Sequence, residues 1–231
     1  VVSAYGEPRI VEPGSNDYQE SPMRKYFKSS GARSTIVVDG KSTVEYINSW
    51  KWGKTPTVWT SGLSNNKKIV SITYGHDGFA PIKCERRVLF VEDRFWIIDD
   101  RVLGLTGNEV SIYFHFSRTD IAICAEGLVG AKIPVTDEKP SIVVAQLAGG
   151  STPLVEDSWY ALEYGVIKEC KKLRLQSVGI SGEFNSRSIL IPFKPGEAQD
   201  FKVKTDTHGL TVMIGKKEKY LVPPLLWSYP I

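Results

Sequence analysis

The chain has 231 residues, of which 42% are hydrophobic and 11% aromatic, so it is long enough for one large domain with a substantial core. Its formal net charge at pH 7 is only +3, which argues against a nucleic-acid-binding protein, because those usually carry a stronger and clustered basic excess. No apolar run approaches the ~18 residues that a membrane-spanning helix needs. The 20 glycines and 13 prolines favour many short strands over long helices.

The chain does not begin with Met, and Val1–Tyr5 already has the pattern of a strand, so we expect a mature product or an excised domain. Its three cysteines, Cys84, Cys124 and Cys170, are widely spaced in or beside apolar segments. That spacing fits neither a zinc site nor a redox pair. Buried free thiols are therefore expected, and one disulfide is compatible with the spacing.

The first forty residues contain the strongest local signals. Val1–Glu12 predicts two short strands, Pro13–Asp17 predicts a loop, and the loop continues from Tyr18 to Gly31, where it can hold a short helical turn. The stretch from Arg24 to Arg33 has four cations, no acidic residue and two aromatic residues. The β-branched run Ser34–Asp39 then predicts a buried strand. A cationic, aromatic loop carried by a strand suits an acidic sugar or another anion, whereas most charge runs are solvated surface.

Strand-like segments recur about every ten residues beyond Gly40, with no convincing long helix. The clearest are Ile69–Tyr74, Val88–Val91, Phe95–Val102, Val110–Phe116, Ile121–Ala125, Gly130–Val135, Ser141–Leu147, Leu173–Ile180, Ser188–Phe193, Phe201–Lys204 and Leu210–Ile214. This pattern predicts an all-β protein, a large antiparallel β-sandwich of stacked sheets without substantial helix. The residues expected in its core include Ile36, Val38, Leu89, Ile97, Phe114 and Ile191.

Two groups of side chains in this part of the chain have open roles. Trp50, Trp52 and Trp59 lie close together in sequence, and they would serve either to stack on sugar rings or to plug the edge of a sandwich. His76 lies in a predicted turn, where it is either a substrate contact or a surface residue. His208 is expected at a hairpin tip.

Two sequence motifs resemble the C-terminal domain of heparinase II/III-type polysaccharide lyases. They are G-x-P-x-I-V-E-P-G, from Gly6 to Gly14, and R-K-Y-F-K-S-S-x-A-R-S-T-I-V-V-D-G, from Arg24 to Gly40. Weaker similarities follow at Trp52-Gly53, at His76–Phe79, at Phe114–Phe116 and at Tyr164-Gly165. The resemblance covers most of the chain and is most specific in its first forty residues.

The resemblance implies that residues 1–231 form the β-sandwich domain of an enzyme that cleaves acidic, uronate-containing polysaccharide by β-elimination. In that family an N-terminal helical α/α toroid supplies part of the catalytic set and most of the sugar-binding groove, and the toroid is absent from this sequence. The implied partners are an acidic polysaccharide and the toroid of the same parent protein. No cofactor is expected, and the substrate class implies an extracytoplasmic location, periplasmic or secreted.

The resemblance also bears on a metal site. Where family members hold a structural metal, the ligands are expected from a His-Gly-His segment, from the Asp of V-D-P-G and from the His of A-H-N-T. Here the last two positions are Glu12 and Arg33. Glutamate can bind zinc, but arginine has no lone pair to donate. We therefore expect no bound zinc, and we expect Arg33 to pair with Glu12.

The same motif match nominates the site residues. As candidate catalytic residues it nominates Tyr18 and Tyr26, with Tyr18 ranked first, and as candidate substrate contacts Arg24, Lys28, Arg33, Trp52 and His76. Each of these residues also fits a packing or surface role. The alternative function is a non-catalytic carbohydrate-binding or structural β-sandwich module, which Glu12 and Arg33 favour. A helical segment upstream that ends in His-Gly-His would distinguish the lyase from this alternative.

Overall fold

A computed structural model describes residues 1–124, 127–207 and 209–223 of the chain. It is 62% strand and 5% helix, so the predicted all-β antiparallel sandwich is confirmed. The helical elements are α1 (Pro22–Lys28), at the place of the predicted helical turn, and the short 3-10 helix η1 (Ser30–Ala32). Within these described ranges, no helix is long and apolar enough to cross a membrane.

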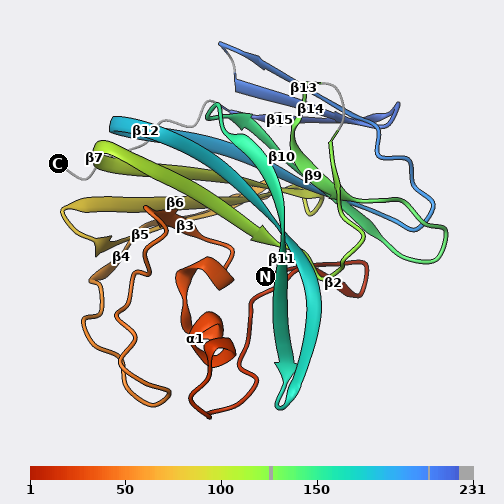
Figure 1. Cartoon of the computed structure of the whole chain (residues 1–231). Coiled ribbons are helices and arrows are strands. Elements are labelled where there is room, and N and C mark those ends of the chain that lie inside the picture. Colours follow the sequence, from red (N-terminus) through yellow and green to blue (C-terminus); the bar gives the residue numbers. More distant parts are fainter. Residues whose placement is uncertain (125–126, 208, 224–231) are drawn as a thin grey trace.

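Ten strands form one large antiparallel sheet (Figure 1). Its main path runs β4-β5-β6-β7-β12-β10-β9-β8, with β3 paired to β7 and β11 paired to β12. These strands are β3 (Ile36–Val38), β4 (Val58–Asn65), β5 (Ile69–Phe79), β6 (Ile82–Val91), β7 (Phe95–His115), β8 (Ala122–Ile123), β9 (Val129–Ile133), β10 (Ser141–Ala148), β11 (Thr152–Glu163) and β12 (Val166–Phe193). The hairpin β1 (Val2–Ala4) and β2 (Glu7–Ile10) is separate, and β13 (Phe201–Asp206), β14 (Gly209–Ile214) and β15 (Glu218–Val222) form a three-stranded sheet.

Two unusually long strands, β7 and β12, run through the centre of the large sheet and pair with each other from Lys172↔His115 to Leu190↔Trp96. The sequence predicts each of them as two separate strands, and that prediction is wrong. Glycines that signal turns lie inside the strands, for example Gly107 with φ 91° and Gly182 with φ 79°. The register also shifts three times between Ser177 and Glu183. The irregularities therefore bend the strands without ending them.

The bend folds the large sheet over a shared hydrophobic core. Ile98 and Val102 from the first half of β7 belong to the same buried cluster as Ile112 and Phe114 from its second half. A second buried cluster joins the opposite face of the sheet to the small sheet, where Leu89 and Ile97 pack with residues such as Val212 of β14. All six predicted core residues are buried.

Sequence reasoning missed three strands, β4, β11 and β15, and placed some boundaries wrongly. β4 includes Gly62 and extends over part of a stretch that reads as a polar turn, while β11 has no clear signal in the sequence. The strand predicted at Ile121–Ala125 corresponds to the two-residue β8, and Ala125 lies outside the described residues, as does His208. The cysteines Cys84, Cys124 and Cys170 are all free.

A buried ion pair on β6 and β7 gives a stability prediction. Arg86 contacts Asp100 through two hydrogen bonds, Nε to Oδ1 at 2.6 Å and Nη2 to Oδ2 at 2.9 Å, and its Nη1 donates to the carbonyl oxygen of Ser34. Both side chains are buried. We expect Asp100→Ala to lower the free energy of unfolding by about 3–5 kcal/mol, because it leaves a buried guanidinium without its counter-charge.

The matched control is Asp157→Ala, which removes a carboxylate that pairs with Lys171 on the surface. That loss should stay within about 1 kcal/mol, since exposed ion pairs contribute little. Denaturant unfolding measures both variants. Equal losses in the two variants would show that the Arg86–Asp100 pair has no special structural role.

Candidate functional site

The helix α1 arranges the cationic loop into defined faces. Ser21 caps it, because the Ser21 side chain accepts a hydrogen bond from the backbone N–H of Arg24 at 3.0 Å, and Pro22 suits the first turn. Arg24 and Lys28 are four residues apart and therefore share one face of the helix. Phe27 is buried and anchors α1 to the rest of the domain. A predicted loop is thus a short, capped helix with a cationic face.

That cationic face holds the segment 45–53. Arg24 donates from Nη2 to the Ser49 carbonyl oxygen at 3.1 Å and from Nη1 to Ser15 Oγ at 2.6 Å. Lys28 Nζ donates to the carbonyl oxygens of Ser49 at 2.9 Å and Asn48 at 3.3 Å. Arg24 is only 4% exposed, so its guanidinium serves this loop and not solvent. Burial, and next the Arg24 charge, lower the pKa of Lys28.

Glu20 fastens the same segment from the other side. Its carboxylate accepts hydrogen bonds from the Tyr46 hydroxyl, at 2.5 Å, and from the Ser49 backbone N–H. The Tyr46 bond and then the Ser49 bond lower the pKa of Glu20, so the carboxylate stays ionised near neutral pH. Lys28 Nζ also lies 4.1 Å from the ring centroid of Trp52 and 5.6 Å from that of Tyr46. Trp52 is therefore joined to the helix through a cation–π contact.

An exposed aromatic surface results from this arrangement, and we call it the aromatic platform: Tyr18, Trp50 and Tyr164. The Tyr18 and Trp50 rings are stacked, with centroids 4.6 Å apart and an interplanar angle of 10°. Tyr164, from the turn between β11 and β12, lies 6.2 Å from Tyr18. Trp50 is 75% exposed, Tyr164 70% and Tyr18 46%, so each ring presents surface to solvent. The Arg24 guanidinium carbon lies 4.8 Å from the Tyr18 centroid.

Tyr26 points elsewhere. Its hydroxyl shares a hydrogen bond of 2.7 Å with Ser158 Oγ on β11, and its ring makes edge contacts with Phe27 and Trp159. Burial raises the pKa of Tyr26, so the phenol keeps its proton at neutral pH. The structure therefore separates the two predicted tyrosines: Tyr18 belongs to the aromatic platform, while Tyr26 packs α1 against β11.

His76 is not in a turn, which corrects the prediction from sequence. It lies within β5 opposite Cys84 of β6, because the strand continues through the glycines around it and the chain turns only at Ala80–Pro81. Its Nδ1 accepts a hydrogen bond from the Gly78 N–H at 3.2 Å, and its ring contacts Phe79. Burial lowers the pKa of His76, which keeps the ring neutral. None of the interactions of the described residues joins His76 to α1 or to the aromatic platform.

Arg33 and Glu12 form the expected ion pair, with Nη1 and Oε2 3.3 Å apart on the surface. His115 lies beside the segment that carries Glu12, because the backbone N–H of Val11 donates a hydrogen bond to the carbonyl oxygen of His115. The imidazole ring of His115 is buried. Burial lowers the pKa of His115 to about 3, with a smaller contribution from Lys172. Within the part of the chain that the structure describes, no group of three His, Cys, Asp or Glu side chains is arranged to hold a metal ion.

Comparison with models of known protein families shows which family the chain belongs to. The family model described as heparinase II/III-like, C-terminal, matches residues 1–205. The chain belongs to this family. No curated protein matches it.

Solved structures agree with this heparinase II/III-like fold. The heparan sulfate lyase HepC from Pedobacter heparinus matches with a TM-score of 0.77 at 15% identity, over 94% of this chain and 35% of that one. A HepC mutant from the same organism matches with a TM-score of 0.78 at 14% identity, over 95% of this chain and 35% of that one. The heparinase III-BT4657 gene product matches with a TM-score of 0.75 at 16% identity, over 94% of this chain and 35% of that one. The chain thus spans about a third of these proteins.

The structure of this heparinase II/III-like domain adds residues that sequence reasoning did not nominate. Tyr164 and Trp50 are as exposed as any aromatic residue of the described chain, and Glu20 holds the loop that carries Trp50. Trp50 had a partial signal, because it stands in a tryptophan-rich segment. Tyr164 had only a weak signal, the similarity to the family pattern at Tyr164-Gly165, and Glu20 had none, since each acquires its place through contact with a distant segment.

Proposed function

We propose that this domain closes the substrate cleft of a lyase that cleaves acidic, uronate-containing polysaccharide by β-elimination. Family membership supports a polysaccharide lyase domain, and the aromatic platform is the observation that carries the proposal further. Aromatic rings offer flat apolar surface to the C–H face of a sugar, and Tyr18 places a hydroxyl within that surface. The rest of the cleft belongs to a helical toroid domain of the same parent protein.

The chemistry requires three tasks. A base removes the proton next to the uronate carboxylate, an acid protonates the departing glycosidic oxygen, and a cation or hydrogen-bond donor stabilises the carboxylate as negative charge develops. We assign the acid role to Tyr18, because its ring is exposed in the platform. Tyr26 is the second candidate, and its half-buried hydroxyl would first have to leave Ser158.

The substrate contacts follow from the same geometry. Trp50, Trp52 and Tyr164 face sugar rings, and Lys28 supplies positive charge beside Trp52. Arg24 positions the loop that carries Trp50, since its guanidinium is already engaged. Arg33 is partly exposed, and it contacts substrate only if its ion pair with Glu12 breaks. His76 would contact a polysaccharide chain that extends as far as β5. A substrate of this class, such as a glycosaminoglycan or alginate, places the parent protein in the periplasm or outside the cell.

The ion pair of Glu12 and Arg33 favours a second candidate, a carbohydrate-binding or structural module without catalysis. It occupies the positions at which the family resemblance expects metal ligands. The lyase and a carbohydrate-binding module both predict sugar binding by the platform, a purely structural module predicts none, and only the lyase predicts product.

The test uses the parent protein and follows the ultraviolet absorbance of unsaturated uronate with heparan sulfate, alginate and hyaluronan. We expect product from at least one of them. Trp50→Ala should raise KM for that polymer about 2–10-fold and leave kcat unchanged, because a stacked aromatic contact contributes about 0.5–1.5 kcal/mol of binding in both ground and transition states.

The control is Tyr5→Ala, which removes another exposed aromatic residue, located in the turn between β1 and β2. It should leave KM unchanged. Absence of product from all three polymers would overturn the lyase assignment in favour of the binding module. An unchanged KM for Trp50→Ala would remove the platform from the substrate site.

A further inference from the structure

The small sheet β13–β15 has two chemically different faces. Leu210, Val212 and Ile214 of β14 are buried against the large sheet. Side chains alternate between the faces of a strand, and directly paired residues share a face, so Thr211 and Met213, which lie between these positions, and their partners on β13 and β15 point outward. Lys202 of β13, Met213 of β14 and Lys219 of β15 form one row across the outer face, and Lys204 pairs with Thr211 in the next row. The three lysines in these rows are exposed.

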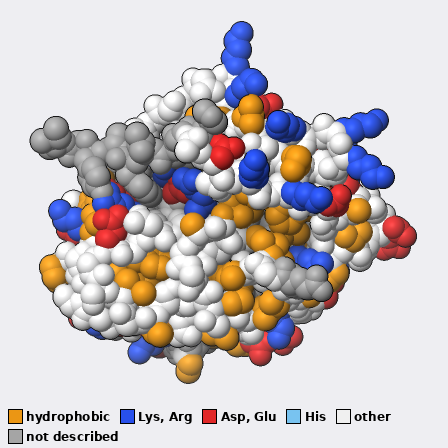
Figure 2. All heavy atoms as spheres, turned by 90° about the horizontal axis from the view of Figure 1, so that it is seen from above, with side chains coloured by type: hydrophobic (Ala, Val, Ile, Leu, Met, Phe, Trp, Pro, Cys, Tyr) orange, Lys and Arg blue, Asp and Glu red, His pale blue; other side chains and the backbone are white. Residues whose placement is uncertain are grey.

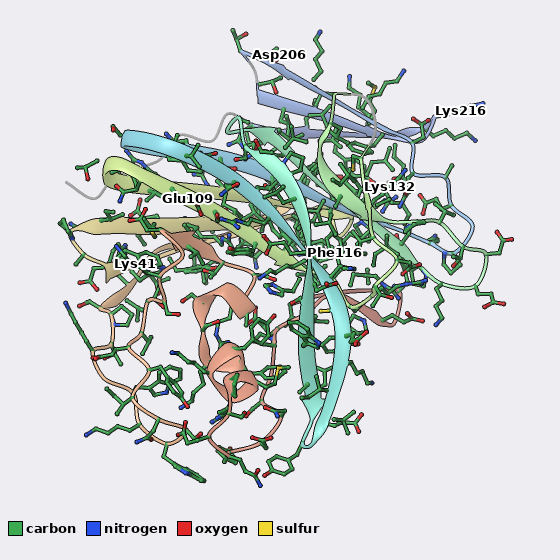
Figure 3. All side chains as sticks on the ribbon, in the orientation of Figure 1. Lys41, Glu109, Phe116, Lys132, Asp206 and Lys216 are labelled. Carbon is green, nitrogen blue, oxygen red and sulfur yellow. The ribbon has the colours of Figure 1, made fainter. Side chains whose placement is uncertain are left out.

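Two further lysines extend this face. Lys216 and Lys217 lie in the exposed turn between β14 and β15. Figure 3 places Lys216 at one end of the small sheet and Asp206 at the other. Figure 2, which looks onto this side of the molecule, shows Lys and Arg side chains gathered over the sheet. We call Lys202, Lys204, Lys216, Lys217 and Lys219 the lysine face.

The lysine face accounts for the whole net charge of the chain. Residues 201–222 contain these five lysines and two acidic residues, Asp206 and Glu218, a formal charge of +3. Removing five from the 29 Lys and Arg, and two from the 26 Asp and Glu, leaves 24 of each in the remainder, which is neutral. The rest of the chain is therefore neutral in total.

No carboxylate neutralises these lysines within the described ranges, where none of the five has a salt bridge. Glu218, the acidic residue closest to them in sequence, is already bound. Its carboxylate accepts from Arg94 Nε at 3.0 Å and from the Tyr220 hydroxyl at 3.1 Å. A flat row of unpaired ammonium groups favours an extended polyanion, because several weak contacts act together on one chain.

We propose that the lysine face is a second binding site for acidic polysaccharide, separate from the aromatic platform. The ligand class rests on the proposed function. The site would hold a linear carboxylated or sulfated chain through its charges alone, since none of the described residues in the lysine rows is an exposed aromatic that could stack on sugar. Such a site keeps a long substrate attached to the domain while the platform engages a different stretch of it, which raises the effective concentration of sugar at the platform.

The test measures binding of the 231-residue chain to immobilised heparan sulfate at low ionic strength. The variant is Lys202→Gln with Lys204→Gln and Lys219→Gln. The matched control is Lys67→Gln with Lys83→Gln and Lys139→Gln, three exposed lysines elsewhere that likewise have no ion pair in the described structure. Both triple variants reduce the net charge from +3 to zero. Unfolding midpoints equal to that of the unmodified chain confirm that both fold.

We expect the lysine-face variant to bind about tenfold more weakly, because three exposed charges that act on one polymer are removed together. The affinity of the control variant for heparan sulfate should change less than twofold. Binding of the unmodified chain should vanish at 1 M salt, where the screening length falls to about 3 Å. Equal weakening of both triple variants, no weakening of either, or no binding of the unmodified chain would each overturn the inference.

Two further probes test the ligand class. Comparable affinity for duplex DNA or for phosphatidylserine vesicles would show a site for general polyanions and overturn the assignment to polysaccharide. Cleavage by the parent protein does not enter this experiment. A failure here therefore leaves the lyase proposal standing, and a parent protein without lyase activity leaves the binding result standing.

Discussion

Replacing Tyr18 by Phe in the parent protein should lower kcat on acidic polysaccharide by about 10²–10⁴-fold, the usual contribution of a positioned acid or base. The KM should change little. The phenylalanine ring can keep the stacked contact with Trp50, whose plane lies only 10° from that of Tyr18, so the sugar-binding surface survives. The lost hydroxyl acts on the departing oxygen only as the bond breaks, and its removal therefore appears in kcat.

Initial rates from the ultraviolet absorbance of the unsaturated uronate give both constants. Tyr5→Phe serves as the control, because it removes a phenolic hydroxyl from the turn between β1 and β2. Full activity of Tyr18→Phe would exclude Tyr18 as the acid. Tyr26 would then take its place, and Tyr26→Phe should show the large loss instead.

Cleavage should be undetectable when this chain is assayed alone, on heparan sulfate, alginate or hyaluronan. Elimination needs a base, an acid and a stabilised carboxylate in one geometry, and much of the rate comes from that positioning. Each missing acid or base costs about 10²–10⁴-fold. The platform offers an acid and a stacking surface, but beside it Arg24 is engaged with the loop that carries Trp50, and Lys28 shares its charge with the same loop. Burial lowers the pKa of both His76 and His115, and neither contacts the platform.

The control for this experiment is the two-domain parent at the same molar concentration. Product from the parent and none from the isolated chain would locate the missing groups in the other domain. Steady product formation by the isolated chain would show instead that its active site is complete and lies away from the residues assigned here.

The sequence determined the class of fold because alternation and turn residues report on individual strands. It identified core positions such as Leu89 and Ile97, which are buried where predicted. It failed at β7 and β12, because a glycine inside a bent strand and a glycine in a turn look the same along the chain. Only the pairing partner distinguishes Gly107 or Gly182 from a turn.

The candidate site was likewise predicted only in part from the sequence. The motif match nominated Tyr18, Arg24, Lys28 and Trp52, and the structure brings these four together around α1. It also separates Tyr26 and His76 from them, which no spacing along the chain revealed. Arg24 illustrates why: its charge suggested a ligand contact, but two hydrogen bonds to Ser15 and Ser49 and near-complete burial show that it supports the loop.

The bent central strands also determine how the domain can fold. Their pairing joins residues far apart in the chain, as in the contact of Arg187 with Asp99, which are 88 positions apart. Such a topology has a high contact order. The chain must lose the conformational entropy of closing these long loops before the burial of either half of the core stabilises it. Folding should therefore be slow, and during synthesis β7 must wait, unpaired on one edge, until the ribosome has released the end of β12. A nascent chain halted before Phe193 would expose that edge to other chains, which makes this interval the period of greatest aggregation risk for the protein.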